Sequence, residues 1–434
     1  MIRRWPLALL VGLTVGIAWT GAHAQAGVGW VVAFAALGSI GTGFGCWLAL
    51  RGHIRTREVL LAAVALRVVA LPMPQTLTTD ASRYLWDGAL VVWEHENPWA
   101  WTPRAWVESG GDAPLSLSEI ASQEYRSVYP PMSQVVFGIA VLAGGTGFGG
   151  WTVLKLIVAA IELAGVFALS RHVSASRLGL YALCPLPAIE FAGQGHTEGI
   201  ALGLLGMGVA AWSAGRRGGA GAALGAAVWT KLWPVLLLSL APLRRSVWRF
   251  WAGGLAAGAV LLAPFLQLGA SWDDLTALLA YAGDLDFFSA PYLLLKSGLW
   301  PLMHARSGAL ASGTLALTLV VWVAVQARRS IRTPTDHTRA AGIGRIAIGA
   351  SLLGAVLHPW NLLPALWGAS LLTGSRRDRA LAVFVVVLVA VAPWTYLVYT
   401  GLPVMPALTY FGWGIALSLA GLAWRANARV GSVQ

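Results

Sequence analysis

The sequence predicts an all-α protein that crosses a membrane many times, and three observations support this prediction. Of the 434 residues, 57% are hydrophobic and only 11% are charged, whereas soluble domains carry about 25% charged residues. The mean hydropathy is +0.68. The apolar residues form long continuous runs, which in a bilayer favours helices over the alternating strands of a barrel. With spans of roughly 20 residues, we expect about 12–14 transmembrane helices.

The basic residues mark the topology and do not indicate a nucleic-acid partner. The formal net charge is +12, but the basic side chains are scattered in small clusters between the apolar runs. Such clusters are typical of cytoplasmic loops. They lie at residues 3–4, 51–57, 171–177, 216–217, 244–249, 328–345 and 376–379, and at Arg425 and Arg429. We therefore expect no nucleic-acid partner, and we expect the connections between these clusters to face outward.

Placing these clusters on one side orders the predicted spans. Spans near 5–24, 28–50 and 58–74 lead to a long external loop over residues 75–151. In that loop, the apolar stretch 130–145 is short for a straight span, so we expect it to dip into the outer surface. Further spans are expected near 152–170, 178–192, 219–231, 233–243, 247–268, 308–327, 343–358, 360–373, 380–399 and 406–424, with another between the outward turn 193–198 and the arginines at 216–217. Residues 269–305 are expected to form an outward loop.

The first two spans are expected to form an N-terminal extension. We assign residues 1–57 to this extension and residues 58–434 to the main transmembrane domain. Residues 1–24 also resemble a cleavable signal peptide, with a basic start, an apolar middle and small residues at the end. Cys46 and Cys184 both lie in apolar runs, which predicts two buried thiols without a disulfide.

A charged segment opens the external loop at Asp80. Asp80, Arg83, Tyr84 and Asp87 recur at helical spacing, so a helix that begins at Asp80 would align them on one face. One interpretation is an interfacial helix in which Arg83 bridges Asp80 and Asp87. The other is a catalytic carboxylate at the start of the helix. The spacing alone leaves both open.

Two further polar groups interrupt the apolar runs. Glu190, His196 and Glu198 flank glycines at an outward turn, which suits either a polar ligand or an ordinary glycine turn. Lys231 is one of only three lysines and precedes Trp233-Pro234, which should break the helix. A lysine beside such a break suits a lipid phosphate, and the alternative is a side chain that snorkels to the interface.

Charges inside the predicted spans and metal ligands are sparse. Lys155 and Glu162 are seven residues apart, as an intramembrane ion pair would be, and Arg67 has no local partner and should face the bundle interior. HExxH, EF-hand and Walker patterns are absent from the sequence. The pairs Glu94-His95-Glu96 and His196-Thr197-Glu198 signal a divalent metal only weakly, so no cofactor is assigned.

In order, these motifs resemble a bacterial branch of the GT-C glycosyltransferases. This branch comprises family 87 and related polyprenol-phosphate-mannose-dependent mannosyltransferases, which are distantly similar to GPI mannosyltransferase I. The resemblance covers about residues 58–400. It rests on Asp80-x-x-Arg83-Tyr84-Leu85-Trp86-Asp87-Gly88, Asn97-Pro98, Tyr129-Pro130-Pro131, Glu190-Phe191-Ala192-Gly193-x-Gly195-His196-x-Glu198, Lys231-Leu232-Trp233-Pro234 and His358-Pro359-Trp360.

The resemblance implies a GT-C-type helical bundle with juxtamembrane helices in the first external loop. It implies transfer of a hexose, mannose favoured, from a polyprenyl-phosphate sugar to a glycan, glycolipid or glycoprotein acceptor of the cell envelope. The site would lie on the extracytoplasmic face of a bacterial inner membrane. Asp80 would be the general base, and Lys231, Arg83 and His196 would bind the donor phosphate. The other substrate-binding candidates are Asp87, Glu198, Glu190, Tyr84, Trp86, Asn97, Tyr129 and His358.

Other functional classes remain open at the level of sequence. Thr79 stands where relatives usually have a second acid before Asp80, and Trp99 follows Asn97-Pro98 where tyrosine is common. A lipid-linked sugar flippase or transporter would also use a broken helix at Lys231. A non-catalytic assembly subunit would tolerate replacement of Asp80. Against a transporter, the polar residues concentrate on one predicted face and the sequence shows no inverted repeat.

Overall fold

The computed structural model describes residues 5–51, 54–120, 122–241, 247–271, 273–274, 286–333 and 335–430. Within these ranges the regular secondary structure is helical, apart from isolated bridges of Phe287 and Phe288 with Val356. Seven of the described helices are long and apolar enough to cross a membrane, which confirms the all-α polytopic prediction. Of the predicted basic clusters, Arg3, Arg4, Arg244, Arg245 and the side chain of Arg429 lie outside the described part of the chain.

The first three helices match the first three predicted spans. They are α1 (Trp5–Ala22), α2 (Val28–Leu50) and α3 (Thr56–Ala70), with a short helix η2 (Ala24–Ala26) between α1 and α2. The late part of the chain packs on α2: Ser39 Oγ donates a hydrogen bond to the carbonyl of Ala390 at 2.6 Å, and Trp394 Nε1 donates to Ser39 Oγ at 3.0 Å. The N-terminal helices are therefore joined directly to the rest of the bundle, and the division at residue 57 stays a prediction.

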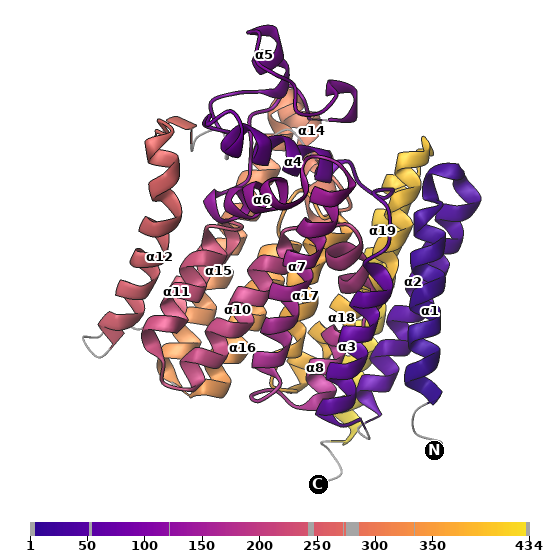
Figure 1. The fold of residues 1–434 in the computed structure, drawn as a ribbon. Coiled ribbons are helices and arrows are strands. Elements are labelled where there is room, and N and C mark those ends of the chain that lie inside the picture. Colours follow the sequence, from indigo (N-terminus) through magenta and orange to yellow (C-terminus); the bar gives the residue numbers. More distant parts are fainter. Residues whose placement is uncertain are drawn as a thin grey trace.

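The external loop folds into a cap of short helices at one end of the bundle (Figure 1). These helices are α4 (Asp80–Val92), α5 (Pro103–Glu108), η3 (Leu117–Glu119) and α6 (Pro131–Gly144). The predicted helix at Asp80 is confirmed, and α6 covers the short apolar stretch. At Gly88, a Cβ atom would lie 2.5 Å from the carbonyl oxygen of Phe137, so the close packing of α4 on α6 requires glycine here.

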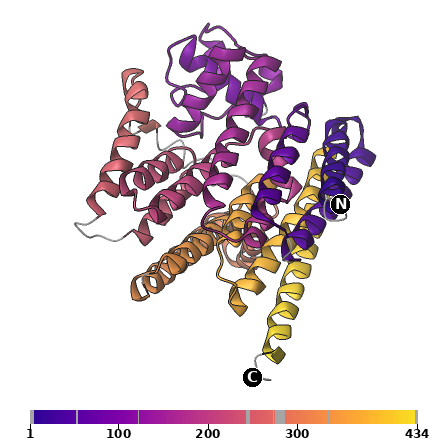
Figure 2. The same ribbon diagram turned by 60° about the horizontal axis from the view of Figure 1, so that its bottom comes forward.

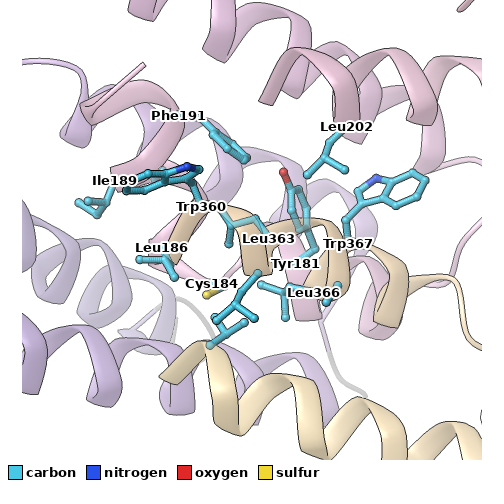
Figure 3. Packing of buried hydrophobic residues seen from close by; sticks show 14 of the residues in the cluster. Tyr181, Cys184, Leu186, Ile189, Phe191, Leu202, Trp360, Leu363, Leu366 and Trp367 are labelled. Atoms are coloured by element: carbon cyan, nitrogen blue, oxygen red, sulfur yellow. The ribbon is translucent and has the colours of Figure 1, made fainter. Parts of the chain in front are cut away.

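The middle of the chain contains a broken span beside two long helices. The elements are α7 (Phe148–Leu169), α8 (Ala175–Ala182), α9 (Pro185–Pro187), the π-helix η4 (Ala188–Gly193) and α10 (Glu198–Ser213). The predicted span 178–192 is present as three short helices, because Pro185 and Pro187 remove backbone donors and the helix changes to π geometry after them. Figure 3 shows the apolar packing around this break, where Leu186 and Phe191 lie near Trp360 and Leu363.

The second half of the chain adds the remaining helices. They are α11 (Arg217–Val228), η5 (Trp233–Leu240), α12 (Trp248–Gln267), α14 (Ala290–Met303), η8 (His304–Arg306), α15 (Ser307–Arg332), α16 (Asp336–Leu352), η9 (Pro359–Leu362), α17 (Leu363–Ser370), α18 (Arg376–Val391), η10 (Ala392–Thr400) and α19 (Met405–Val430).

The predicted break at Lys231 is confirmed, because α11 ends at Val228 and η5 resumes at Trp233. Two other predictions need correction. The expected loop 269–305 contains the helix α14, although residues 272 and 275–285 lie outside the described ranges. The expected span 343–358 ends early at Leu352, which leaves His358 on a loop.

Loops of different character lie at the two ends of the bundle (Figure 1). The cap with α4, α5 and α6 lies at one end, together with α14. The turns that join α7 to α8 and α10 to α11, together with the start of α1 and the end of α19, lie at the other end. Those two turns carry predicted basic clusters. The predicted separation of basic turns from the long loop is therefore present in the fold.

The buried charges pair differently from the prediction. Arg67 faces the bundle interior, as expected, but its partner is Glu162, with Nη2 2.7 Å from Oε1 and Nε 3.1 Å from Oε2. Lys155 instead donates to the carbonyl oxygens of Leu71 and Met73, at 2.6 and 2.7 Å. The predicted pair of Lys155 with Glu162 is therefore wrong. Arg67 of α3 occupies Glu162, and the carbonyls that follow the end of α3 lie beside α7, where they accept from Lys155. The two cysteines are free thiols.

Candidate active site

A cavity of about 780 Å³ lies where the cap meets the broken helices. This volume is in the range of small-molecule sites, which span roughly 300–1,000 Å³. Its walls come from η2, from the segments that precede α4 and α6, and from the break after α11. The loop before η9, η9 itself and the end of η10 complete them. The lining residues are Gln25, Thr76, Leu77, Thr78, Thr79, Asp80, Val128, Tyr129, Lys231, Gly354, Ala355, Val356, His358, Trp360, Asn361 and Tyr399.

Asp80 places a carboxylate at the edge of this cavity. It is the first residue of α4, and its backbone N–H donates to Thr78 Oγ1 at 3.1 Å. The Tyr84 hydroxyl donates to Oδ2 at 3.4 Å, and His196 Nδ1 lies 3.8 Å from the same oxygen. The side chain remains 35% exposed. A partly open carboxylate in a cavity can accept a proton from a ligand.

The surroundings of Asp80 adjust its acidity. Desolvation at the cavity edge, with a smaller effect of the nearby Glu198 carboxylate, raises the pKa of the Asp80 carboxyl to about 6. The Lys231 ammonium and the hydrogen bond from Tyr84 oppose this shift. The group is therefore mostly ionised at neutral pH, yet basic enough to take a proton, which suits a general base.

Arg83 and Asp87 hold the cap together and do not line the cavity. Arg83 Nε donates to Asp87 Oδ1 at 2.7 Å, and its Nη1 donates to the carbonyls of Ser122 and Tyr125 at 3.0 and 2.7 Å. The prediction that Arg83 bridges both Asp80 and Asp87 is therefore correct for Asp87 and wrong for Asp80. Because its donors are directed at the loop, Arg83 is poorly placed for a phosphate in the cavity.

Two other predicted substrate contacts also lie in the cap. Trp86 is fully buried in a small apolar cluster with Leu90, Trp106 and Ile120. Asn97 Nδ2 donates to Asp274 Oδ2 at 2.9 Å and does not reach the cavity lining. Both side chains stabilise the cap, which in turn fixes the start of α4.

Lys231 supplies the cavity with a cation. Its ammonium lies 2.9 Å from Glu198 Oε1 and 5.1 Å from the centroid of the Tyr129 ring. The helix break is anchored to α6, since the Met132 N–H donates to the Trp229 carbonyl at 2.9 Å. The side chain is 24% exposed, so the ammonium can contact a ligand while Glu198 holds it in place.

His196 is buried and uncharged. Its ring stacks on Trp360 with centroids 3.8 Å apart, and its Nε2 lies 3.4 Å from Glu190 Oε2. Burial, with Lys231 and His358 nearby, keeps the pKa of His196 well below its usual value. A neutral imidazole brings no positive charge to a phosphate. The geometry instead places His196 between the carboxylates of Glu190 and Asp80.

Of the remaining candidates, two line the cavity and two lie behind its lining. Tyr129 and His358 line the cavity. Tyr84 lies behind Asp80, with its ring stacked on Phe137 at 4.6 Å. Glu190 is fully buried and accepts hydrogen bonds from the Tyr396 hydroxyl at 2.9 and 3.1 Å.

Three residues outside the predicted set support the site. Gln194 Nε2 donates to the Pro74 carbonyl at 3.1 Å, and its Oε1 accepts from the Leu77 N–H at 3.3 Å, which ties the chain before Asp80 to η4. Trp360 supports His196, and Tyr396 supports Glu190. Gln194 and Trp360 stand within recognisable motifs, whereas Tyr396 lies in an apolar run that carries no local signal.

The described residues contain no group of three or more His, Cys, Asp or Glu side chains arranged to hold a metal ion. The weak metal signals at residues 94–96 and 196–198 therefore form no such group within the described part of the chain. No residue here is assigned to a cofactor.

Comparison with known proteins identifies a family. The model of glycosyltransferase family 87 matches residues 128–352, which is about half of the chain. This range includes Tyr129, Glu190, His196, Glu198 and Lys231, while Asp80 lies before it. No curated protein matches the chain significantly.

Proposed function

Because the chain belongs to glycosyltransferase family 87 and is a multi-pass membrane glycosyltransferase, we propose that its donor is a polyprenyl-phosphate sugar. The transferred sugar is a hexose, with mannose favoured, and the acceptor is a hydroxyl of a cell-envelope glycan, glycolipid or glycoprotein. The cavity faces the extracytoplasmic side of a bacterial inner membrane. The observation that carries this proposal is the presence of a basic carboxylate, Asp80, and a cation, Lys231, in one cavity.

The proposed reaction moves one sugar and one proton. Asp80 removes the proton from the acceptor hydroxyl as that oxygen attacks the anomeric carbon. The bond between the anomeric carbon and the phosphate oxygen breaks, and the lipid leaves as a phosphate monoester. Negative charge builds on this phosphate, where Lys231 stabilises it. Glu198 keeps the ammonium of Lys231 in position through the 2.9 Å contact.

The rate of transfer should fall in acid. Asp80 must be ionised to accept a proton, and desolvation raises its pKa to about 6. Below that pH the carboxyl is protonated, so the rate should drop about tenfold for each further pH unit. Initial rates measured from about pH 4.5 to 8 give the profile. A rate that stays constant down to pH 5 would contradict Asp80 as the base.

Replacing Lys231 by glutamine should weaken donor binding. A charged hydrogen bond to phosphate contributes roughly 1.5–3 kcal/mol, so the donor KM should rise about tenfold to a hundredfold. Lys296→Gln is the matched control, because Lys296 pairs with Asp286 and does not line the cavity. Equal values of kcat/KM for the donor in the two variants would remove Lys231 from the donor site.

The choice of donor tests the proposed function. Purified protein is incubated with membrane extract as acceptor and with one radiolabelled donor at a time: polyprenyl-phosphate mannose, polyprenyl-phosphate glucose or GDP-mannose. We expect label in the acceptor from the lipid-linked donors, most from the mannose lipid. Transfer from GDP-mannose alone, or from none of the three, would overturn the proposal.

A further inference from the structure

The cavity is built by two groups of elements from different parts of the bundle. Tyr129 lies just before α6, and Lys231 lies in the break between α11 and η5. Gln25, Asn361 and Tyr399 come from η2, η9 and η10, and η10 packs on both α2 and η9. The two views place α11 on one side of the bundle and α1 with α2 on the other (Figures 1 and 2). The cavity thus joins a wall that carries Lys231 to a second wall, and Asp80 belongs to the same cavity.

A column of aromatic rings supports the second wall. Its neighbouring rings have centroids 3.8, 4.5, 4.0 and 6.3 Å apart, in the order His196, Trp360, His358, Phe287 and Tyr399. The column begins at the buried ring beside Asp80 and ends at Tyr399, which is 57% exposed. Backbone hydrogen bonds of Phe287 with Ala355 and Leu357 hold it in place. Tyr399 is therefore a supported aromatic surface at the cavity, of the kind on which the apolar face of a sugar can stack.

Neutral polar groups accompany Tyr399 on this wall. The Gln25 side chain is exposed. Asn361 Nδ2 donates to the Val356 carbonyl at 3.3 Å, and its Oδ1 accepts no hydrogen bond from the described residues. Amide groups donate to and accept from hydroxyls, so this wall offers hydrogen bonds without charge.

Charge limits what this wall can bind. The acidic and basic side chains among the described lining residues are Asp80, Lys231 and His358, and burial lowers the pKa of His358 to about 4, so its ring is neutral at pH 7. Lys231 already faces Glu198 and, in the proposed function, the donor phosphate. An anionic ligand on the second wall would lie near Asp80 without a cation of its own, which is unfavourable in a desolvated site. A cationic ligand would pair with Asp80 and block it as a base.

From this arrangement we propose that the wall of Gln25, Asn361 and Tyr399 is the acceptor subsite, and that it binds an uncharged sugar stacked on Tyr399. The inference rests on the proposed function and adds the class of the acceptor. All three residues lie outside the family match at 128–352, whereas Tyr129 and Lys231 lie inside it. The donor side is thus built by the part that matches the family, and the acceptor side is built by the flanking segments, including the N-terminal helices.

Binding of simple glycosides tests the subsite without requiring transfer. The full-length protein is titrated in saturation-transfer NMR with methyl α-D-mannopyranoside, which is neutral, and with the methyl glycosides of glucuronic acid and glucosamine, which are charged. We expect binding of the neutral glycoside only, and about tenfold weaker binding to Tyr399→Ala. Tyr410→Ala is the matched control, because Tyr410 is an exposed tyrosine of α19 that does not line the cavity.

The outcomes separate this inference from the proposed function. Failure of the neutral glycoside to bind, equal binding of the charged glycosides, or unchanged binding to Tyr399→Ala would each overturn the subsite. Binding that depends on Tyr399, together with no transfer from any donor, would keep the subsite and overturn the proposed function. Transfer with an acceptor KM that does not change in Tyr399→Ala would keep the function and overturn the subsite.

Discussion

Asp80→Asn is expected to lower the transfer rate by about 10²–10⁴-fold, the usual contribution of a positioned general base. Asparagine keeps the shape of the side chain and the backbone N–H that bonds to Thr78 Oγ1 at 3.1 Å, but its amide cannot take a proton. Lys231 and Tyr129 are untouched, so the donor KM should stay near that of the wild type. The kcat and donor KM of the purified variant give both values.

Asp112→Asn is the matched control for this prediction. Asp112 is an exposed acid of the same external loop and does not line the cavity. Its replacement should leave kcat unchanged. If Asp80→Asn keeps the activity of the control, Asp80 is not the base, and a non-catalytic role of this residue gains support.

Glu162→Leu is expected to lower the free energy of unfolding by about 3–5 kcal/mol, the cost of leaving one member of a buried ion pair alone. Arg67 and Glu162 are only 2% and 1% exposed, and their contact at 2.7 Å lies between α3 and α7. Without Glu162, the hydrogen bonds left to the Arg67 guanidinium among the described residues are those to the carbonyls of Ala63 and Ala182. Unfolding of the purified protein in detergent gives the difference.

The double variant Arg67→Leu, Glu162→Leu should recover most of this loss, because it leaves no unpaired charge inside the bundle. Asp336→Asn is the control for an exposed pair: its contact with Arg339 is 3.8 Å, and its loss should cost less than about 1 kcal/mol. If Glu162→Leu is no less stable than Asp336→Asn, the buried pair contributes little to the free energy of unfolding.

Features of the fold that depend on local sequence could be predicted, and those that depend on distant partners could not. The long apolar runs predict the spans, Trp233-Pro234 predicts the break after α11, and the spacing from Asp80 predicts α4. Arg67 and Glu162 are 95 residues apart, so no local pattern pairs them. The break in the predicted span 178–192 has a local signal, because Pro185 and Pro187 cannot donate the backbone hydrogen bonds of a helix.

The same distinction between local signals and distant partners holds for the candidate site. Lys231 was predicted from its place at a helix break, and the structure puts it in one cavity with Asp80. Arg83 was predicted to bind a phosphate because it is positively charged. In the structure its guanidinium donates instead to Asp87, four residues later in the chain. The neutrality of His196 depends on its burial against Trp360, which only the tertiary structure reveals.

In the proposed function, the protein breaks the bond between a sugar and a lipid phosphate, and does not merely carry the lipid across the membrane. The most direct measurement follows radiolabelled polyprenyl-phosphate mannose in proteoliposomes that contain the purified protein and membrane-extracted acceptor. We expect label to appear covalently on the acceptor, with an equal amount of free polyprenyl phosphate, and neither product with Asp80→Asn. Label that stays on the lipid and only changes leaflet would contradict the claim and identify a flippase.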